Sequence, residues 1–194
     1  MYKKNDEGFT GLEAAIVLIA FVVVAAVFSY VVLGAGFFTT QKSQEVVHTG
    51  VQQASSTLEI VGNVYGTGSG GSTTQVDFIQ FSVALAPGGT SVDFAQVVMT
   101  YSDATNLVTL AQTAGTYPVS GNPVTGNWQV IQIQNGNTDK LLESGEQFVI
   151  KARPIASGIT VNKKFTLEIK PSIGAAFGIT RSTPGGLQGV NILY

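Results

Sequence analysis

The chain contains no cysteine and only one histidine, His48. The absence of cysteine excludes disulfides, thiol catalysis and cysteine-ligated metals, and one histidine leaves little for triads or general acid–base chemistry. We therefore expect neither an enzyme nor a cofactor. Only 11% of the 194 residues are charged, against roughly 25% in an ordinary globular domain. The formal net charge of -2 provides no basic surface for nucleic acid.

One long apolar run stands near the N-terminus. No charged side chain occurs between Glu13 and Lys42, and the 25 residues 14–38 are almost entirely apolar. As a helix this stretch is about 37 Å long, enough to cross a hydrocarbon core of about 30 Å. Lys3 and Lys4 precede the run, which predicts a cytoplasmic N-terminus and export of the remainder.

A helical pattern continues beyond the apolar run. Apolar residues recur at steps of four, three, four and three, which predicts a one-sided seam on one helix spanning 9–62. This helix is expected to span the membrane, and the part of the seam outside lipid needs a partner, either the chain's own globular domain or neighbouring helices. The seam residues are Val47, Val51, Ala54, Leu58 and Val61.

The remainder of the chain changes in character. Residues 63–74 are rich in Gly, Ser and Thr, which is typical of a linker. From residue 75 onward, short β-prone runs alternate with turn residues, which predicts a β-sandwich over 75–194. The fold class is thus α+β, a long N-terminal hydrophobic α-helix followed by an antiparallel Ig-like β-sandwich. Residues 111–127 are interpreted as a long exposed loop. The expected strands are 76–85, 92–101, 107–110, 128–133, 148–152, 165–169 and 190–193.

The first residues read KKNDEGFTGLEAAIVLIAF, a short polar leader that ends in Gly8 before the apolar run. This arrangement resembles the class III signal of type IV pilin-like proteins, in which a membrane aspartyl peptidase cuts after the glycine. The resemblance implies that residues 1–8 are a leader that is removed between Gly8 and Phe9. Residues 11–38, followed by Thr-Thr-Gln-Lys, resemble more narrowly the N-terminus of archaeal flagellins (archaellins).

The archaellin resemblance implies a structural subunit of the archaellum, the extracellular filament that drives swimming. Helices leave the cytoplasmic membrane to form the filament core, and sandwich domains cover its surface. The implied partners are other copies of the chain, paralogous archaellins, the membrane aspartyl preflagellin peptidase, and the export and motor machinery. The chain has no Asn-x-Ser/Thr sequon, so N-glycosylation at that sequon is not expected.

Glu13 is the candidate assembly residue with its own physical argument. A carboxylate beside a uniformly apolar helix is costly unless it is paired. Cleavage before Phe9 creates an amine four residues earlier on about the same face, and Glu13 can pair with that amine in its own or a neighbouring chain. The simpler interpretation is that Glu13 only marks the membrane boundary in water.

Other functions fit the sequence less well. The same export route serves archaeal adhesion pilins, and a membrane-anchored sandwich that binds a ligand is a further alternative. A Sec-type cut near Gly34-Ala35-Gly36 is disfavoured, because the apolar run before it, about 20 residues, exceeds the roughly 7–15 of a secretory h-region.

A calcium-loop spacing also occurs in the sandwich region. Asn135, Asn137, Asp139, Glu143 and Glu146 fall at positions 1, 3, 5, 9 and 12 of the calcium-binding loop pattern. The sixth position is a lysine in place of glycine, and no helices flank the segment. We interpret it as a polar turn between strands, with calcium binding as the alternative.

Overall fold

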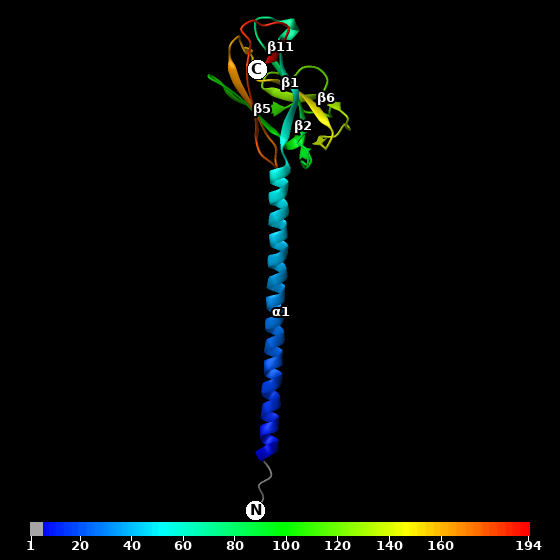
Figure 1. Cartoon of the computed structure of the whole chain (residues 1–194), viewed down its shortest axis with the longest axis vertical. Coiled ribbons are helices and arrows are strands. Elements are labelled where there is room, and N and C mark those ends of the chain that lie inside the picture. Colours follow the sequence, from blue (N-terminus) through cyan, green and yellow to red (C-terminus); the bar gives the residue numbers. More distant parts are fainter. Residues whose placement is uncertain (1–5) are drawn as a thin grey trace, which may run out of the picture. The chain divides into compact units, whose positions relative to one another are not determined.

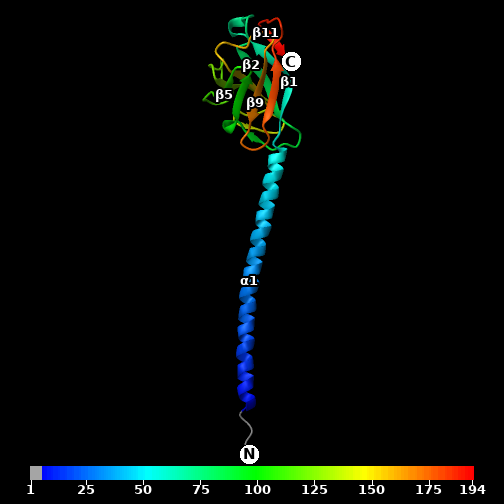
Figure 2. The same ribbon diagram turned by 90° about the vertical axis from the view of Figure 1, so that its left-hand side faces the viewer.

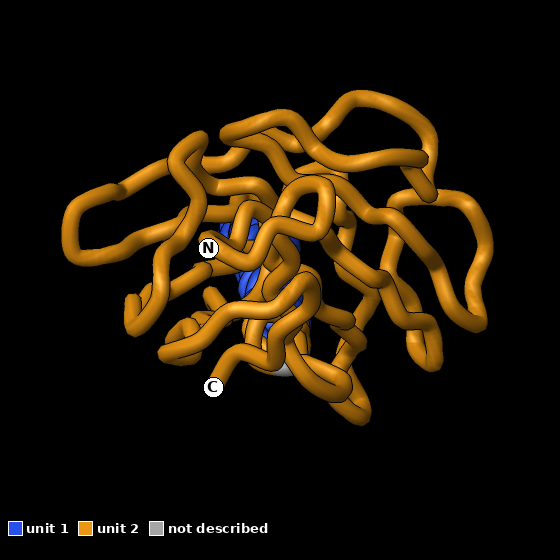
Figure 3. The backbone as a smooth tube through the Cα atoms, turned by 90° about the horizontal axis from the view of Figure 1, so that it is seen from above, with its two compact units in different colours: residues 1–49 blue, residues 50–194 orange. Residues whose placement is uncertain are grey.

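The computed structural model describes residues 6–194, except the side chains of residues 6–9 and 55. Residues 1–5 of the predicted leader therefore lie outside the described part. The chain divides into two compact units, residues 1–49 and 50–194, which Figure 3 distinguishes by colour. A single long helix precedes all the strands of the described residues, which confirms the predicted fold class.

Helix α1 runs from Asp6 to Ser55 without interruption (Figure 1). Its 50 residues correspond to about 75 Å of helix. The segment contains no proline, and the glycines at 34, 36 and 50 do not break it. Because a helix satisfies all its interior backbone groups internally, an apolar segment of this length is stable in a surrounding without water.

The predicted helix 9–62 is wrong at its C-terminal end. The helix ends at Ser55, and strand β1 begins at Leu58. Pairing with a neighbouring strand buries Leu58 to 1% exposure opposite Leu85, so sheet formation overrides the helical spacing. Gly62, the last residue of the predicted helix, has φ of +81° and lies within a register shift of β1.

The predicted linker 63–74 is also corrected. Its first residues belong to β1, and Ser69–Gly71 form a short 3-10 helix, η1. The buried carboxylate of Asp77 accepts hydrogen bonds from the Ser69 amide at 2.6 Å and from Gln75 Nε2 at 2.7 Å. Close packing explains the glycine at position 66, because a Cβ there would lie 2.8 Å from a methyl group of Val76.

The sandwich contains eleven strands and a further 3-10 helix, η2 (Figure 2). The strands are β1 Leu58–Thr67, β2 Phe78–Leu85, β3 Val92–Asp93, β4 Val98–Asp103, β5 Leu107–Gln112, β6 Asn127–Gln134, β7 Leu141–Leu142, β8 Gln147–Arg153, β9 Lys164–Lys170, β10 Phe177–Ser182 and β11 Val190–Leu193, and η2 is Phe94–Gln96.

Nine of these strands form one sheet in the order β10-β9-β4-β5-β6-β8-β2-β1-β11, and β3 pairs separately with β7. Every pairing is antiparallel except the short one between β5 and β6. Backbone hydrogen bonds between Ser182 and Tyr194 join the two outer ends of this strand order. The sheet thus folds over onto itself and encloses one core.

The core draws large side chains from both halves of the sheet. Trp128 and Phe148 both contact Phe94 of η2 edge-on, with ring centroids 6.3 and 5.1 Å away. Tyr101 stacks on Phe165 at 5.9 Å. All five rings are at most 1% exposed, so aromatic packing holds the sandwich together in a chain without disulfides.

All seven predicted strands overlap observed ones, with three differences. The predicted strand 92–101 is split by η2, whose first turn is capped by the Asp93 carboxylate. Strands β1, β7 and β10 were not expected. The predicted exposed loop 111–127 is wrong in part, because Tyr117 is 2% exposed and packs edge-on against Phe148.

Candidate assembly interface

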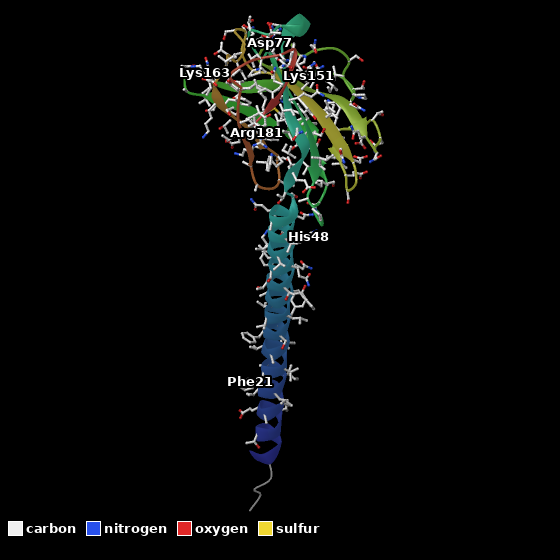
Figure 4. All side chains as sticks on the ribbon, turned by 45° about the horizontal axis from the view of Figure 1, so that its top comes forward. Phe21, His48, Asp77, Lys151, Lys163 and Arg181 are labelled. Carbon is white, nitrogen blue, oxygen red and sulfur yellow. The ribbon has the colours of Figure 1, made fainter. Side chains whose placement is uncertain are left out.

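The apolar surface of α1 is exposed on every side of the helix. The large apolar residues from Leu12 to Phe38 are between 52% and 81% exposed, with Val32 and Tyr30 at the extremes. Phe21, labelled in Figure 4, is 69% exposed. Soluble monomers rarely expose an apolar patch above a few hundred Å2, so this surface must be covered by lipid or by protein. Of the described helices, α1 alone is long and apolar enough to cross a membrane.

The predicted cleavage and pairing residues lie at the start of α1. Gly8 and Phe9 belong to the helical segment, and the Phe9 side chain lies outside the described part. Glu13 is exposed. The first turn of a helix leaves its amides without intrahelical partners, so Gly8 lies where the backbone unwinds most readily. This position is compatible with a peptidase that needs an extended substrate, and the cut itself remains a prediction.

The predicted seam is not a single helical surface. Val47 and Val51 are 62% and 60% exposed on α1, and Ala54 is exposed beside them. Leu58 and Val61 lie in β1, paired with Leu85 and Ser82 of β2. The structure therefore leaves three of the five seam residues on α1 and assigns the other two to the sandwich.

The polar residues that follow the apolar run interact mainly with their own helix. Lys42 and Glu45 form an ion pair at 2.7 Å with both side chains more than half exposed, which contributes little to stability. The hydroxyls of Thr39 and Thr40 donate to the carbonyls of Ala35 and Gly36, each at 2.8 Å. His48 also lies on this part of the helix (Figure 4).

A tight junction at the start of the sandwich was missed by sequence reasoning. Ser56 is 1% exposed, its hydroxyl is hydrogen-bonded to that of Thr90, and its amide donates to Gln52 at 2.9 Å. Gly174 lies so close that a Cβ there would be 2.1 Å from the Ser56 carbonyl oxygen. No local pattern could reveal these contacts, because 118 positions in the chain separate residues 56 and 174.

The segment with calcium-loop spacing is a turn held by its own hydrogen bonds. Glu146 is 6% exposed, and its carboxylate accepts from the amides of Asn137 and Glu143 at 3.1 and 3.0 Å. The side-chain oxygen Oδ1 of Asn137 accepts a hydrogen bond from the backbone amide of Asp139 at 2.7 Å. Asn135, which directly follows β6, has φ of +55°. Among residues 6–194, no three Asp, Glu or His side chains gather as metal ligands.

A hollow of about 180 Å3 lies beside the turn 103–106, with Lys163 in its lining (Figure 4 labels this lysine). The Asp103 carboxylate holds this turn together. It accepts hydrogen bonds from the Thr105 amide at 2.7 Å and from the Tyr101 hydroxyl at 2.9 Å. Burial raises the pKa of Asp103, but these bonds and those from Asn106 outweigh it and hold the pKa well below its usual range. A carboxylate saturated in this way builds the turn and is a poor general base.

Comparisons with known proteins point to one family. A family model described as archaeal-type flagellin matches residues 8–181. The chain is 40% identical over 199 residues to probable flagellin 1 of Archaeoglobus fulgidus, covering 99% of this chain and 97% of that protein.

One solved structure agrees with this assignment, and a second shares the fold. A chain of the archaeal flagellum of Methanospirillum hungatei strain JF1 superposes with a TM-score of 0.72 and 36% identity, covering 95% of this chain and 99% of that one. Flagellin FlaB1 of Methanocaldococcus jannaschii shares the fold, with a TM-score of 0.56 at 16% identity, over 70% of this chain and 95% of that one. The resemblance seen in the N-terminal residues is thereby confirmed, and the chain belongs to the archaeal-type flagellin family.

Proposed function

We propose that the chain is made as a precursor anchored in the cytoplasmic membrane by α1, cut between Gly8 and Phe9, and then assembled with its own copies. The mature chain is a structural subunit of the archaellum filament that serves motility. The observation that carries the proposal is the apolar surface of α1, exposed on all sides over residues 14–38 and attached to an ordered sandwich. Lipid covers this surface before assembly, and neighbouring helices cover it afterwards.

Burial of this surface supplies the driving force for the filament. At about 25 cal/mol per Å2 of apolar area, covering a 25-residue apolar cylinder contributes on the order of tens of kcal/mol before entropic costs. The same area is already buried in lipid in the precursor, so the net gain on assembly is smaller and depends on close side-chain packing. Close packing and specific pairs therefore decide how the helices align in the filament.

The proposed partners follow from this route. A membrane aspartyl peptidase removes residues 1–8, export and motor components of the archaellum receive the mature chain, and paralogous archaellins share the filament. The sandwich is exposed to the extracellular medium. We infer a structural rather than catalytic role, supported by the flagellin relatives and by a sandwich whose Asp103 and Glu146 carboxylates are occupied by turn hydrogen bonds.

Glu13 sets the axial alignment of neighbouring helices in this proposal. Its carboxylate pairs with the new amine of Phe9, and Glu13→Ala removes that pair while leaving the cleavage sequence intact. An unpaired buried charge costs about 3–5 kcal/mol, so we expect the number of filaments per cell to fall at least roughly tenfold. The measurement is a filament count by electron microscopy together with the N-terminus of the membrane-bound chain.

Glu7→Ala is the matched control for this experiment, because it makes the same change within the proposed leader. A leader residue is absent from the assembled chain, so this variant should form filaments at the wild-type number. A wild-type filament count in Glu13→Ala would contradict the pairing, as would an equal loss in both variants.

A further inference from the structure

Two cations lie over one aromatic ring on the outer face of the sandwich. Phe78 directly precedes the core residue Ile79 on β2, so the two side chains point to opposite faces of the sheet. The outward ring of Phe78 is nevertheless only 3% exposed. Lys151 Nζ and Arg153 Cζ of β8 lie 4.8 and 5.4 Å from its centroid, and Figure 4 labels Lys151. Lys151 and Arg153 therefore form a cation pair that covers the ring.

No carboxylate of the same chain neutralises this cation pair. Among residues 6–194, neither Lys151 nor Arg153 forms an ion pair. Burial lowers the pKa of Lys151, and Arg153 Nε is buried with no hydrogen-bond partner. Two like charges that are partly removed from water are costly unless an opposite charge compensates them. A carboxylate is the acceptor that matches the donors of a guanidinium. The cation pair is thus suited to a carboxylate supplied from outside the chain.

A neighbouring loop holds the cation pair in position. Lys151 Nζ donates a hydrogen bond to Asn122 Oδ1 at 2.7 Å. This loop is fastened to β6, because the buried side chain of Gln129 donates to the carbonyls of Val119 and Gly121 at 3.4 and 2.9 Å. A cation that is already positioned loses less conformational entropy when it binds a partner.

The turn that joins β6 to β8 carries the opposite charge. Residues 135–146 contain three carboxylates and one cation, Lys140, which lies over the Tyr117 ring at 5.2 Å. Glu143 is exposed and forms no ion pair within the described part of the chain. Its backbone is fixed, since its amide donates to the Glu146 carboxylate at 3.0 Å and its carbonyl accepts from the Glu146 amide at 3.2 Å. This acidic turn therefore presents the Glu143 carboxylate from an ordered backbone.

The cation pair and the acidic turn lie at opposite ends of the paired strands β6 and β8. Gln147 begins β8 beside the acidic turn, and Lys151 and Arg153 follow four and six residues later. At roughly 3.3 Å per residue these positions are about 13 and 20 Å further along the strand, too far for Glu143 of the same chain. Copies that repeat head to tail bring the two ends together. Such a heterologous contact builds an open helical array.

We propose that the cation pair of Lys151 and Arg153 binds the Glu143 carboxylate of another copy in the filament. The inference rests on the proposed function and adds a contact between sandwiches to the contacts between helices. Charge complementarity favours another copy as the partner, because each copy carries both the unneutralised cations and the unneutralised carboxylate. Glu168, another exposed carboxylate, lies instead on the same face of β9 as two lysines and is less suited to the contact.

The test reverses each charge singly and then both together. Arg153→Glu, Glu143→Arg and the double variant are expressed in a strain that lacks the gene for this chain, with the wild type in parallel. Filaments are counted by electron microscopy, and thermal unfolding of the full chain in detergent checks each fold. Lys170→Glu and Glu168→Arg are the matched controls, because they reverse exposed charges on β9, outside the proposed contact.

We expect each single reversal at the contact to lose at least roughly tenfold of the filaments, because like charges then meet across the interface. The double variant restores opposite charges, so its filament number should recover to within about twofold of wild type. Both controls should also stay within about twofold of wild type, because their sites are independent of the contact.

A wild-type filament number in Glu143→Arg would overturn the inference, and a simultaneous loss in Arg153→Glu would then assign the cations to an anion from outside the chain. Failure of the double variant to recover would overturn it as well. If Arg153→Glu lowers the unfolding midpoint, Lys151→Glu takes its place in the single and double variants. In each of these outcomes the wild type still forms filaments. Absence of the wild-type chain from filaments would instead remove the proposed function, and this inference with it.

Discussion

Gly8→Val is expected to leave the chain uncleaved in the membrane fraction and absent from filaments. An aspartyl peptidase binds its substrate extended, with the backbone close to the catalytic carboxylates, and a branched Cβ beside the scissile bond obstructs that approach. An uncut chain also keeps residues 1–8, so no free amine forms at Phe9. We expect the processed fraction to fall from nearly all of the chain to about a hundredth or less, since a barrier increase of roughly 3 kcal/mol lowers a rate by about a hundredfold.

Gly11→Val serves as the matched control for this change. Gly11 lies on the mature side of the proposed cut, and a Cβ there meets nothing within 4 Å. This variant should be processed normally. Mass spectrometry of the membrane-bound chain measures the processed fraction of both variants. Normal processing of Gly8→Val would show that the cut lies elsewhere.

Gly174→Ala is expected to destabilise the sandwich severely. Gly174 has φ of +113°, a conformation that residues with a side chain rarely adopt, and its Cβ would lie 2.1 Å from the Ser56 carbonyl oxygen. Backbone strain and overpacking each cost roughly 1–3 kcal/mol, so we expect the free energy of unfolding to fall by about 2–5 kcal/mol. For a unit of this size, the unfolding midpoint should fall by roughly 5–15 °C.

The experiment measures thermal unfolding of the full chain in detergent by the near-ultraviolet signal of Trp128 and the other buried rings. Gly178→Ala is the control, because Gly178 lies in β10, has no positive φ, and offers open space to a Cβ. Its midpoint should stay within about 2 °C of wild type. Equal midpoints for the two variants would refute the close contact between Gly174 and Ser56.

The long helix and most strands were predictable because their signals are local. An uncharged run of 25 apolar residues has no stable arrangement in lipid other than a helix, and alternation such as that in 79–85 indicates one buried face. The same local logic misassigned Leu58 and Val61. Their spacing suits a helix, but pairing with Leu85 and Ser82 of β2 decides their conformation.

In the candidate assembly interface, too, some residues could be identified from the sequence and others only from the structure. Gly8, Phe9 and Glu13 stand in one short motif and were accessible from sequence, although their roles remain predictions. The contact between Ser56 and Gly174 joins distant parts of the chain and needed the structure.

The most direct test of the central claim is the N-terminus of this chain in sheared surface filaments, determined by mass spectrometry. A chain that begins at Phe9 in those filaments is the expected result, since it joins the predicted cut to assembly in one observation. A chain that is absent from the filaments and still begins at Met1 in the membrane fraction would contradict both the processing and the filament role, and would favour an anchored binding module.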